Sequence, residues 1–199
     1  MCRSTRGGVV ARYGKEHKEA SRRRIVEAAG RRFKRDGIDG SGIATLMADA
    51  GLTNGAFYAH FDSKADLVAT TIAEQLREQR ESYWQQPGAG VEQLVREYLS
   101  VRHRDDPEHG CPSAALLDEI GRCSTSTKRA YTDGVLAIAD EIAARLAPDD
   151  PESARATTLS LFALLIGTLQ LSRALTDRQL ADEVLEQGIQ NALALLPSA

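Results

Sequence analysis

The sequence predicts an all-α protein of about nine helices. Apolar residues recur at three- and four-residue spacing through every patterned segment, and no strand-like alternation of apolar and polar residues persists. Turn-forming stretches rich in Pro, Gly, Asp and Ser separate these segments. With 42% hydrophobic and 27% charged residues among 199, the composition is that of a soluble globular protein, long enough for a small domain joined to a larger one.

The first predicted helix covers 17–36 and ends at Gly37, a residue that commonly terminates helices. Residues four apart share one face of a helix, and here they form an apolar stripe: Ile25, Ala29 and Phe33. A short second helix follows at 42–50, and Gly51 after it permits a tight left-handed turn. The inward face of this second helix comprises Ile43, Leu46, Met47 and Ala50.

A third short helix is predicted at 54–61, because the Thr53 hydroxyl before it can cap its first backbone N–H groups. A fourth helix, 63–86, begins at the sequence SKAD, which is a weak capping box. The segment QQPGAG then interrupts the helical pattern. Five further helices are predicted near 91–103, 113–122, 127–147, 152–174 and 178–195.

Charge is distributed unevenly along the chain. Residues 1–64 carry 13 Lys and Arg against 7 Asp and Glu, a net charge of +6, whereas the remaining 135 residues carry 12 against 21, a net charge of −9. This separation is typical of a protein that presents one end to a polyanion. Alternatively, the positive charges belong to a solvated helix face, or those of the first few residues are a remnant of expression.

The sequence also bounds the compartment. No stretch approaches the roughly 18 consecutive apolar residues of a membrane span. The arginine-rich N-terminus lacks the apolar region of a secretory signal. Three cysteines, Cys2, Cys111 and Cys123, are an odd number and too few for a disulfide framework. A cytoplasmic protein without a membrane partner is therefore expected.

Three of the ten aromatic residues fall between positions 57 and 61. Phe57 and Phe61 lie four apart on a helix and share its inward face, so both are predicted to be core residues. Around them stand side chains that can donate hydrogen bonds to phosphate oxygens: Thr45, Thr53, Asn54, Tyr58, His60 and Lys64. For single residues the alternatives are structural, with Tyr58 half-buried in packing and His60 satisfying its own helix. Two short helices, a Gly-containing turn and this polar rim together predict a helix-turn-helix.

Residues 22–68 resemble the N-terminal domain of the TetR family of bacterial transcriptional regulators, most specifically in the segment AGLTNGAFYAHFDSKADL. The resemblance implies an all-α homodimer whose helices 42–50 and 54–61 form the helix-turn-helix. It also implies that the helix 63–86 connects this unit to a C-terminal domain that binds a ligand and dimerises. The implied contacts to the DNA backbone are Tyr58, His60 and Lys64, with Thr53 and Asn54 near the bases.

The segment departs from the family at two positions, because Gly42 and Ala44 are small where members often have Thr or Ser and a long polar side chain. The helix 42–50 is therefore expected to read few bases, and Ser41 is expected to take over capping and phosphate contact. Direct base readout rests on few side chains, since Ala56 and Ala59 offer no polar group.

The predicted domain organisation has three parts: a flexible basic arm at 1–16, a helix-turn-helix domain at 17–62, and a ligand-binding and dimerisation domain at 63–199. The arm contains Lys15 and several glycines. Two interpretations of the arm remain open and carry equal weight. It either follows the phosphate backbone or the minor groove, or tethers the protein to DNA non-specifically.

The segment 156–175 is apolar nearly all round, which predicts burial on several sides. Paired with the helix 178–195, it is the predicted four-helix dimer interface; an ordinary core helix is the alternative. The predicted interface residues are Leu161, Leu164, Leu165, Gly167, Leu171, Val184 and Ile189.

The segment HRDDPEHGCPSAALLDEIGRC, 103–123, is the most unusual part of the acidic half. Its His, Asp, Glu and Cys residues match no metal-site spacing, so a solvated loop is expected and no metal or cofactor is predicted. Cys111 precedes a helix that Ser113 could cap, and a thiol at a helix N-terminus can be reactive. A thiol sensor at Cys111 with Cys123 as partner, and a packing cysteine at Cys111, are the two interpretations.

The predicted function is a ligand-responsive regulator, most simply a repressor, that binds a palindromic operator in double-stranded DNA as a homodimer. A small-molecule effector, mostly apolar, or an electrophile would release it. The alternative is an all-α adaptor without sequence-specific DNA binding. Enzyme motifs such as G-x-S-x-G, the P-loop and H-E-x-x-H are absent from the sequence, so an enzyme is not predicted.

Overall fold

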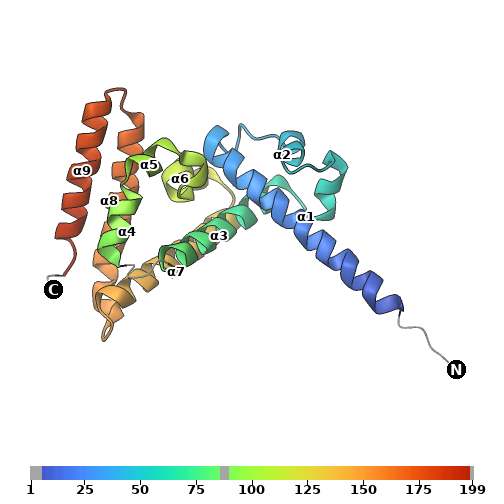
Figure 1. Cartoon of the computed structure of the whole chain (residues 1–199), viewed down its shortest axis with the longest axis horizontal. Helices are drawn as coiled ribbons and strands as arrows, with labels where there is room; N and C mark the ends of the chain where they lie inside the picture. The colour runs from blue at the N-terminus through green and yellow to red at the C-terminus, as the bar shows by residue number, and fades with distance from the viewer. Residues whose placement is uncertain (1–5, 86–89, 198–199) are drawn as a thin grey trace.

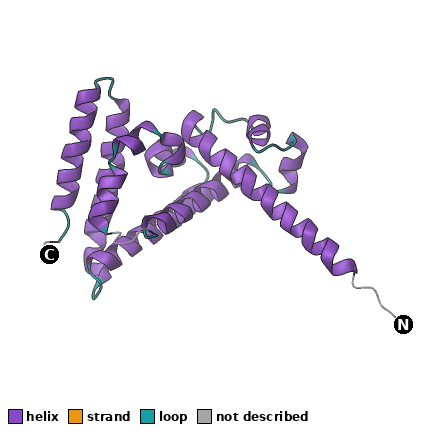
Figure 2. Ribbon diagram, in the orientation of Figure 1, coloured by secondary structure: helices purple, strands orange, loops and turns teal. Residues whose placement is uncertain are grey.

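The structure is a computed structural model that describes residues 6–85 and 90–197, with side chains described from Glu16 onward. Within these residues every regular element is a helix (Figure 2), as the sequence predicts. One long helix projects from one end of the molecule, and the C-terminal helices form the other end (Figure 1).

The N-terminal unit comprises α1 (Arg6–Asp36), α2 (Ile43–Asp49) and the 3-10 helix η1 (Asn54–Ala59). Gly37, with φ of 81°, ends α1, and Gly51, with φ of 66°, makes the turn between α2 and η1. The side chains that hold the three helices together are fully buried: Ile25, Ala29, Phe33, Leu46, Met47 and Phe57. The predicted inward faces are therefore confirmed, although the helix after Gly51 is a 3-10 helix rather than an α-helix.

The predicted flexible arm was wrong for residues 6–16, because α1 begins at Arg6 and continues through them without a break. Glycines at 7, 8 and 14 lower helix propensity but did not interrupt this helix. Lys15 lies in this part of α1, and its side chain falls outside the described side chains. The basic segment therefore extends from the body as a helix (Figure 1).

The helix α3 (Lys64–Tyr83) follows the N-terminal unit and lies beside α7 (Thr125–Leu146) in Figure 1. Its cap is the predicted one, since the Ser63 hydroxyl accepts the Asp66 N–H at 3.1 Å. The Asp66 carboxylate reaches one residue further than in a standard capping box and accepts the Asp62 N–H at 3.2 Å.

The single helix expected at 91–103 is two helices, α4 (Val91–Tyr98) and α5 (Val101–Asp105). The chain breaks because Ser100 caps α5, its hydroxyl accepting the His103 N–H at 3.2 Å. A 3-10 turn, η2 (Pro107–His109), leads from α5 to α6 (Pro112–Arg122).

Two long helices, α8 (Pro151–Ala174) and α9 (Arg178–Ala194), complete the fold, and α8 packs between α7 and α9. By length and mean hydropathy alone α8 could cross a membrane, although it contains no run of 18 consecutive apolar residues. Core helices of soluble proteins pass the same test. In this fold α8 contributes fully buried Leu161 and Leu169 to the hydrophobic core.

Candidate functional site

Polar side chains cover the outer face of η1 as predicted. Tyr58 is 71% exposed, and its ring meets the edge of buried Phe57 at a centroid distance of 5.1 Å. Thr53 occupies the cap position of η1, but its side chain makes no capping hydrogen bond. Thr53, Asn54 and Thr45 on α2 are exposed, while Lys64 at the start of α3 is half-buried. Thr45, Thr53, Asn54 and Tyr58 are thus open to solvent, whereas Lys64 lines a second pocket beside Glu119 and Cys123.

Ser41 does not belong to this surface, so its predicted capping and phosphate role was wrong. Its side chain is fully buried and its hydroxyl donates to the Gly37 carbonyl oxygen at 2.7 Å. The cap position of α2 is Gly42, which has no side chain to cap with. A Ser in the turn after α1 therefore closes that turn instead of facing solvent.

Two basic residues of α1 that the motif did not include lie behind this surface. The Arg22 guanidinium stacks over the Phe61 ring at 4.2 Å, donates to the His60 carbonyl oxygen and lies 3.3 Å from the Thr70 hydroxyl. Burial lowers the pKa of His60, as do the charges of Lys18 and Arg22. Lys18 and Arg22 are four residues apart and share one face of α1, and this spacing could have indicated from the sequence that they act together.

The His60 ring has a second unusual feature. Its Nδ1 is buried and has no hydrogen-bond partner within the described residues. A buried polar nitrogen without a partner is uncommon in folded proteins. The structure therefore does not support the alternative in which the His60 ring forms a hydrogen bond within its own helix.

The C-terminal half holds the N-terminal unit at three points around α6. The Lys34 ammonium donates to the Gly110 carbonyl oxygen at 2.9 Å, and Arg35 lies 3.8 Å from the Glu108 carboxylate. The Glu119 carboxylate accepts the backbone N–H of Ile38 at 2.7 Å. These contacts join the turn after α1 to both ends of α6, a connection that no local sequence pattern indicated.

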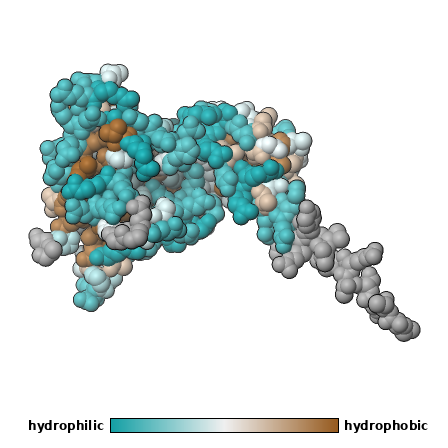
Figure 3. All heavy atoms as spheres, viewed as in Figure 1, coloured by the Kyte–Doolittle hydropathy of each residue, from teal (hydrophilic) through white to brown (hydrophobic). Residues whose placement is uncertain are grey.

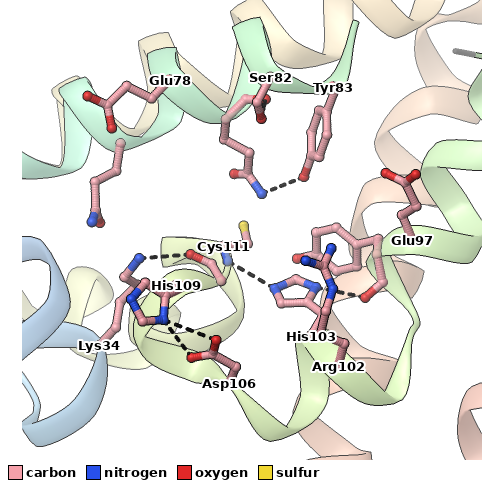
Figure 4. Close-up of a pocket in the computed structure, with 14 residues that line it drawn as sticks. Lys34, Glu78, Ser82, Tyr83, Glu97, Arg102, His103, Asp106, His109 and Cys111 are labelled. Carbon is pink, nitrogen blue, oxygen red and sulfur yellow. Dashed lines mark hydrogen bonds and ion pairs between the residues drawn. The ribbon is translucent and has the colours of Figure 1, made fainter. Parts of the chain in front are cut away.

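A cavity of about 400 Å³ lies where α1, α3, α4 and η2 meet (Figure 4). Of the described residues, fourteen line it, and none has an aliphatic or Phe side chain. The polar walls come from α1 (Lys34), from α3 (Gln75, Glu78, Gln79, Ser82, Tyr83), and from the α4–η2 region (Glu97, Tyr98, Arg102, His103, Asp106, His109). The cavity does not support the expected mostly apolar ligand.

Cys111 lies at the centre of this cavity, with its sulfur directed toward α3 (Figure 4), although the residue is only 1% exposed. Its backbone N–H donates to His103 Nε2 at 3.0 Å, and His103 Nδ1 lies 2.7 Å from the Tyr98 carbonyl oxygen. A carbonyl only accepts, so Nδ1 carries the proton and the ring is neutral. Burial lowers the pKa of His103 to about 4, and the nearby Arg173 and Lys34 charges act in the same direction.

The predicted cap of α6 and the predicted cysteine pair were both wrong. Cys111 occupies the cap position, whereas Ser113 is buried and accepts the Tyr131 hydroxyl at 3.1 Å. Cys123 caps the other end of α6, about 18 Å away at 1.5 Å per residue. A disulfide requires Cα atoms within about 7 Å, so the two thiols cannot pair within one chain.

The remaining acidic residues of the segment 103–123 are held by basic side chains. Asp105 bonds Arg104 and Arg178, each at 2.8 Å, and Asp106 bonds His109 at 2.9 Å. Within the described residues no group of three or more His, Cys, Asp or Glu is placed to hold a metal ion. These residues build the fold around the cavity.

The predicted dimer residues divide into two groups. Leu161, Leu165 and Ile189 are buried inside the protomer and have no surface to offer a partner, so their assignment to the interface was wrong. Gly167 is exposed and Leu171 is 53% exposed, with Leu164 and Val184 half-buried. Apolar surface gathers where α8 and α9 meet the solvent (Figure 3), and other exposed leucines on these helices and the adjoining C-terminal turn are Leu159, Leu180 and Leu195.

Comparison with known sequences identifies the N-terminal unit. The family described as "Bacterial regulatory proteins, tetR family" matches residues 25–71. The HTH-type transcriptional regulator TtgR of Pseudomonas putida is 38% identical over 63 residues, which are 32% of this chain and 30% of that protein. The probable HTH-type transcriptional regulator ArpR, also of Pseudomonas putida, is 41% identical over 63 residues, with the same coverage. The aligned part spans about a third of the length of these relatives.

Solved structures extend the likeness of fold to nearly the whole chain. The reduced form of E. coli NemR superimposes with a TM-score of 0.70 at 15% sequence identity, covering 90% of this chain and 98% of that one. A TetR-family transcriptional regulator from Cytophaga hutchinsonii gives a TM-score of 0.72 at 17% identity, covering 92% and 98%. At these identities the similarity concerns the fold.

Proposed function

We propose that the chain is a TetR-family DNA-binding regulator that responds to a small molecule, because residues 25–71 match that family and the N-terminal unit resembles that of TtgR. In this proposal it acts in the cytoplasm as a homodimer on a palindromic operator, and represses by occupying the promoter. The observation that carries the proposal is the exposed Tyr58 on η1, held over buried Phe57 among other polar side chains.

In the proposed complex η1 enters the major groove. Thr53 and Asn54, exposed at its start, lie near the bases, and Tyr58, His60 and Lys64 contact phosphates. Thr45 on α2 adds a polar group on the same side. Few side chains offer hydrogen bonds to bases, so much of the affinity comes from phosphate contacts and depends on salt.

Two further basic residues support the phosphate contacts. Lys18 and Arg22 lie close enough to His60 to lower its pKa. A phosphate oxygen placed beside the three groups would offset their mutual repulsion and favour the protonated ring. The positive charges of Lys18 and Arg22 therefore attract a DNA phosphate to the surface around His60 before η1 has entered the groove.

The proposed dimer joins the exposed faces of α8 and α9 from two protomers. Gly167 and Leu171 lie on the α8 face, with Leu180 on α9. A two-fold dimer presents its two recognition elements to half-sites one helical turn apart, roughly 34–36 Å, or a multiple of that distance. An inverted-repeat operator follows from this symmetry.

The proposed effector occupies the cavity at Cys111. Its walls include Lys34 of α1 as well as residues of α3, so an occupant touches both the N-terminal unit and the connecting helix. A ligand that binds one arrangement of these helices better than the other changes the separation of the two recognition elements. An electrophile that modifies the Cys111 thiol would act at the same place.

The test is selection from random duplex DNA by wild-type protein, Tyr58→Ala and the control Thr132→Ala, which changes an exposed position on α7. Wild type and the control are expected to enrich an inverted repeat, and Tyr58→Ala is expected to enrich none. On the recovered operator, Lys64→Ala should lower affinity and reduce the slope of log K against log salt by about 0.9. If no protein enriches any sequence at low salt, the adaptor alternative replaces the regulator.

A further inference from the structure

We propose that the effector of the cavity at Cys111 is a small, uncharged, hydroxyl-rich molecule; this inference rests on the proposed function of that cavity. Ligand pockets are mostly apolar, with a few polar groups that orient the ligand. Here no aliphatic or Phe side chain of the described residues lines the cavity of about 400 Å³, and its walls combine polar groups with two tyrosine rings, the Cys111 thiol and the methylene stems of long polar side chains. A molecule that combines hydroxyl groups with a carbon frame therefore suits these walls better than a purely apolar one.

Polar atoms without partners surround the cavity. The side-chain oxygens of Gln75 and Gln79, one turn apart on α3, are buried and have no hydrogen-bond partner within the described residues, and the buried hydroxyl of Tyr98 on α4 has only the weakly bonding Cys111 thiol beside it. Tyr98 is only 3% exposed, so solvent outside the cavity does not satisfy it. Leaving such groups unpaired is unfavourable, and a ligand that pairs with them gains that free energy on binding.

Hydroxyl groups fit this set better than a pure donor or a pure acceptor. A glutamine amide presents an oxygen acceptor or an NH₂ donor depending on its orientation, and a tyrosine hydroxyl does both. A ligand hydroxyl also donates and accepts, so it pairs with Gln75 and Tyr98 in either amide orientation. An ammonium group only donates hydrogen bonds and a carboxylate only accepts them, so each pairs with the glutamine amide in just one of its two orientations.

The charged residues of the lining favour an uncharged ligand. Both signs face the cavity, Lys34 and Arg102 against Glu78, Glu97 and Asp106. A charged ligand would therefore approach a like charge on one wall while losing its own hydration.

Three of these charges are already engaged. Lys34 donates to the Gly110 carbonyl oxygen at 2.9 Å, Glu97 accepts from Gln93 at 2.9 Å, and Asp106 accepts from His109 at 2.9 Å. The lining atoms that lack partners are the amide oxygens of Gln75 and Gln79, which are neutral groups. The ligand is thus selected by hydrogen bonding rather than by charge.

The test uses purified full-length protein without DNA, so its outcome is independent of operator binding. The probes are glucose, galactose and mannose, each compared with its 2-amino and its uronic-acid counterpart, by thermal shift and isothermal titration calorimetry. At least one uncharged hexose is expected to bind, with both charged counterparts at least tenfold weaker. Equal or tighter binding of a charged counterpart, or no binding of any hexose, overturns the proposed ligand class. A regulator that selects an operator would stand in either case.

Two variants locate the binding. Gln75→Leu removes an unpartnered oxygen and is expected to fold at least as stably as wild type, and Tyr98→Phe removes a hydroxyl that bonds only the Cys111 thiol. Both are expected to bind the hexose at least tenfold more weakly. Gln179→Leu, at an exposed position at the start of α9, is the matched control and should bind as wild type does. Unchanged affinity in both cavity variants would place the hexose elsewhere and refute the proposal.

Discussion

The Glu119 carboxylate of α6 accepts the backbone N–H of Ile38 at 2.7 Å and lies 3.3 Å from that of Asp39. These two N–H groups belong to the turn between α1 and α2, 81 and 80 positions before Glu119. The contact leaves no room for a side chain at Gly37, where an added Cβ would lie 2.9 Å from a Glu119 oxygen. One carboxylate of the C-terminal half therefore sets the geometry of the turn that precedes the helix-turn-helix.

Removing this carboxylate should loosen the turn. We expect Glu119→Ala to lower the free energy of unfolding by about 1–3 kcal/mol, because a part-buried backbone donor loses its acceptor. Glu119→Gln should lower it less, since the amide oxygen still accepts. Urea unfolding measures both values, and amide hydrogen exchange should quicken at Ile38 and Asp39. Asp118→Ala, one position away and exposed, is the control, and equal effects of the two alanine variants would contradict the assignment.

Lys34 should make stability depend on pH in the alkaline range. Burial lowers its pKa from 10.5 to about 8 in the folded protein, so between these values the unfolded chain binds more protons than the native one. The unfolding free energy contributed by this group then rises as pH increases from 8 to 10.5. We expect the difference between wild type and Lys34→Met to shift in favour of wild type across this range, measured by urea unfolding from about pH 7 to about pH 10. A difference that stays constant with pH would be the contrary result.

Substitution of Gly167 can test the proposed dimer contact without disturbing the packing of the protomer. A Cβ added at Gly167 meets no atom within 4 Å, whereas one added at Gly188 lies 2.4 Å from Thr168 Cγ2. Gly167→Leu should therefore leave the protomer folded and disrupt the dimer, as measured by light scattering and circular dichroism. Gly121→Leu, at an equally open position on α6, should remain dimeric, and Gly188→Ala should destabilise the protomer itself. A dimeric Gly167→Leu would place the interface elsewhere.

The two described cysteines should differ in reactivity. Cys111 is buried, whereas Cys123 is half-buried at the far end of α6, with a pKa raised by burial and by nearby Asp39 and Glu119. N-ethylmaleimide should modify Cys123 before Cys111, as followed by mass spectrometry of the separate peptides that contain each cysteine, Cys2 included. The early adduct on the peptide that contains position 123 should be absent in Cys123→Ser.

The thiol-sensor hypothesis for Cys111 remains a prediction with its own test. An electrophile small enough to enter the cavity should weaken operator binding by wild type and by Cys123→Ser, but not by Cys111→Ser. Unchanged operator binding in all three proteins after electrophile treatment would leave Cys111 as a packing residue. No oxidant should produce a Cys111–Cys123 bond within one chain.

The sequence pattern predicted those features that depend on interactions between residues within one helical turn. Phe57 and Phe61 share a face because a helical turn places them there, and Ser63 caps α3 because its hydroxyl lies next to the first free N–H groups. The same reasoning failed at Ser100, where a short hydroxyl side chain started a new helix within an unbroken apolar pattern. Capping and helix continuation compete at such a residue, and packing decides between them.

Long-range contacts were the other limit. Nothing near Lys34 indicates that its ammonium would bond the Gly110 carbonyl oxygen, 76 positions away. The cavity is polar because α1, α3 and the α4–η2 region meet there, each contributing its polar side. A sequence pattern describes each face but not which faces meet.

The position of Lys34 has a consequence for building chimeric regulators. An exchange of DNA-binding units at the boundary after residue 62 would carry Lys34 into a foreign cavity and leave Gly110 and Glu119 facing a foreign turn. The two units therefore cannot be separated at a single position of the chain without breaking contacts between them. Under the proposed function, a hybrid designed to keep the effector response should take α1, η2 and α6 from the same protein, so that their matched contacts are transferred together.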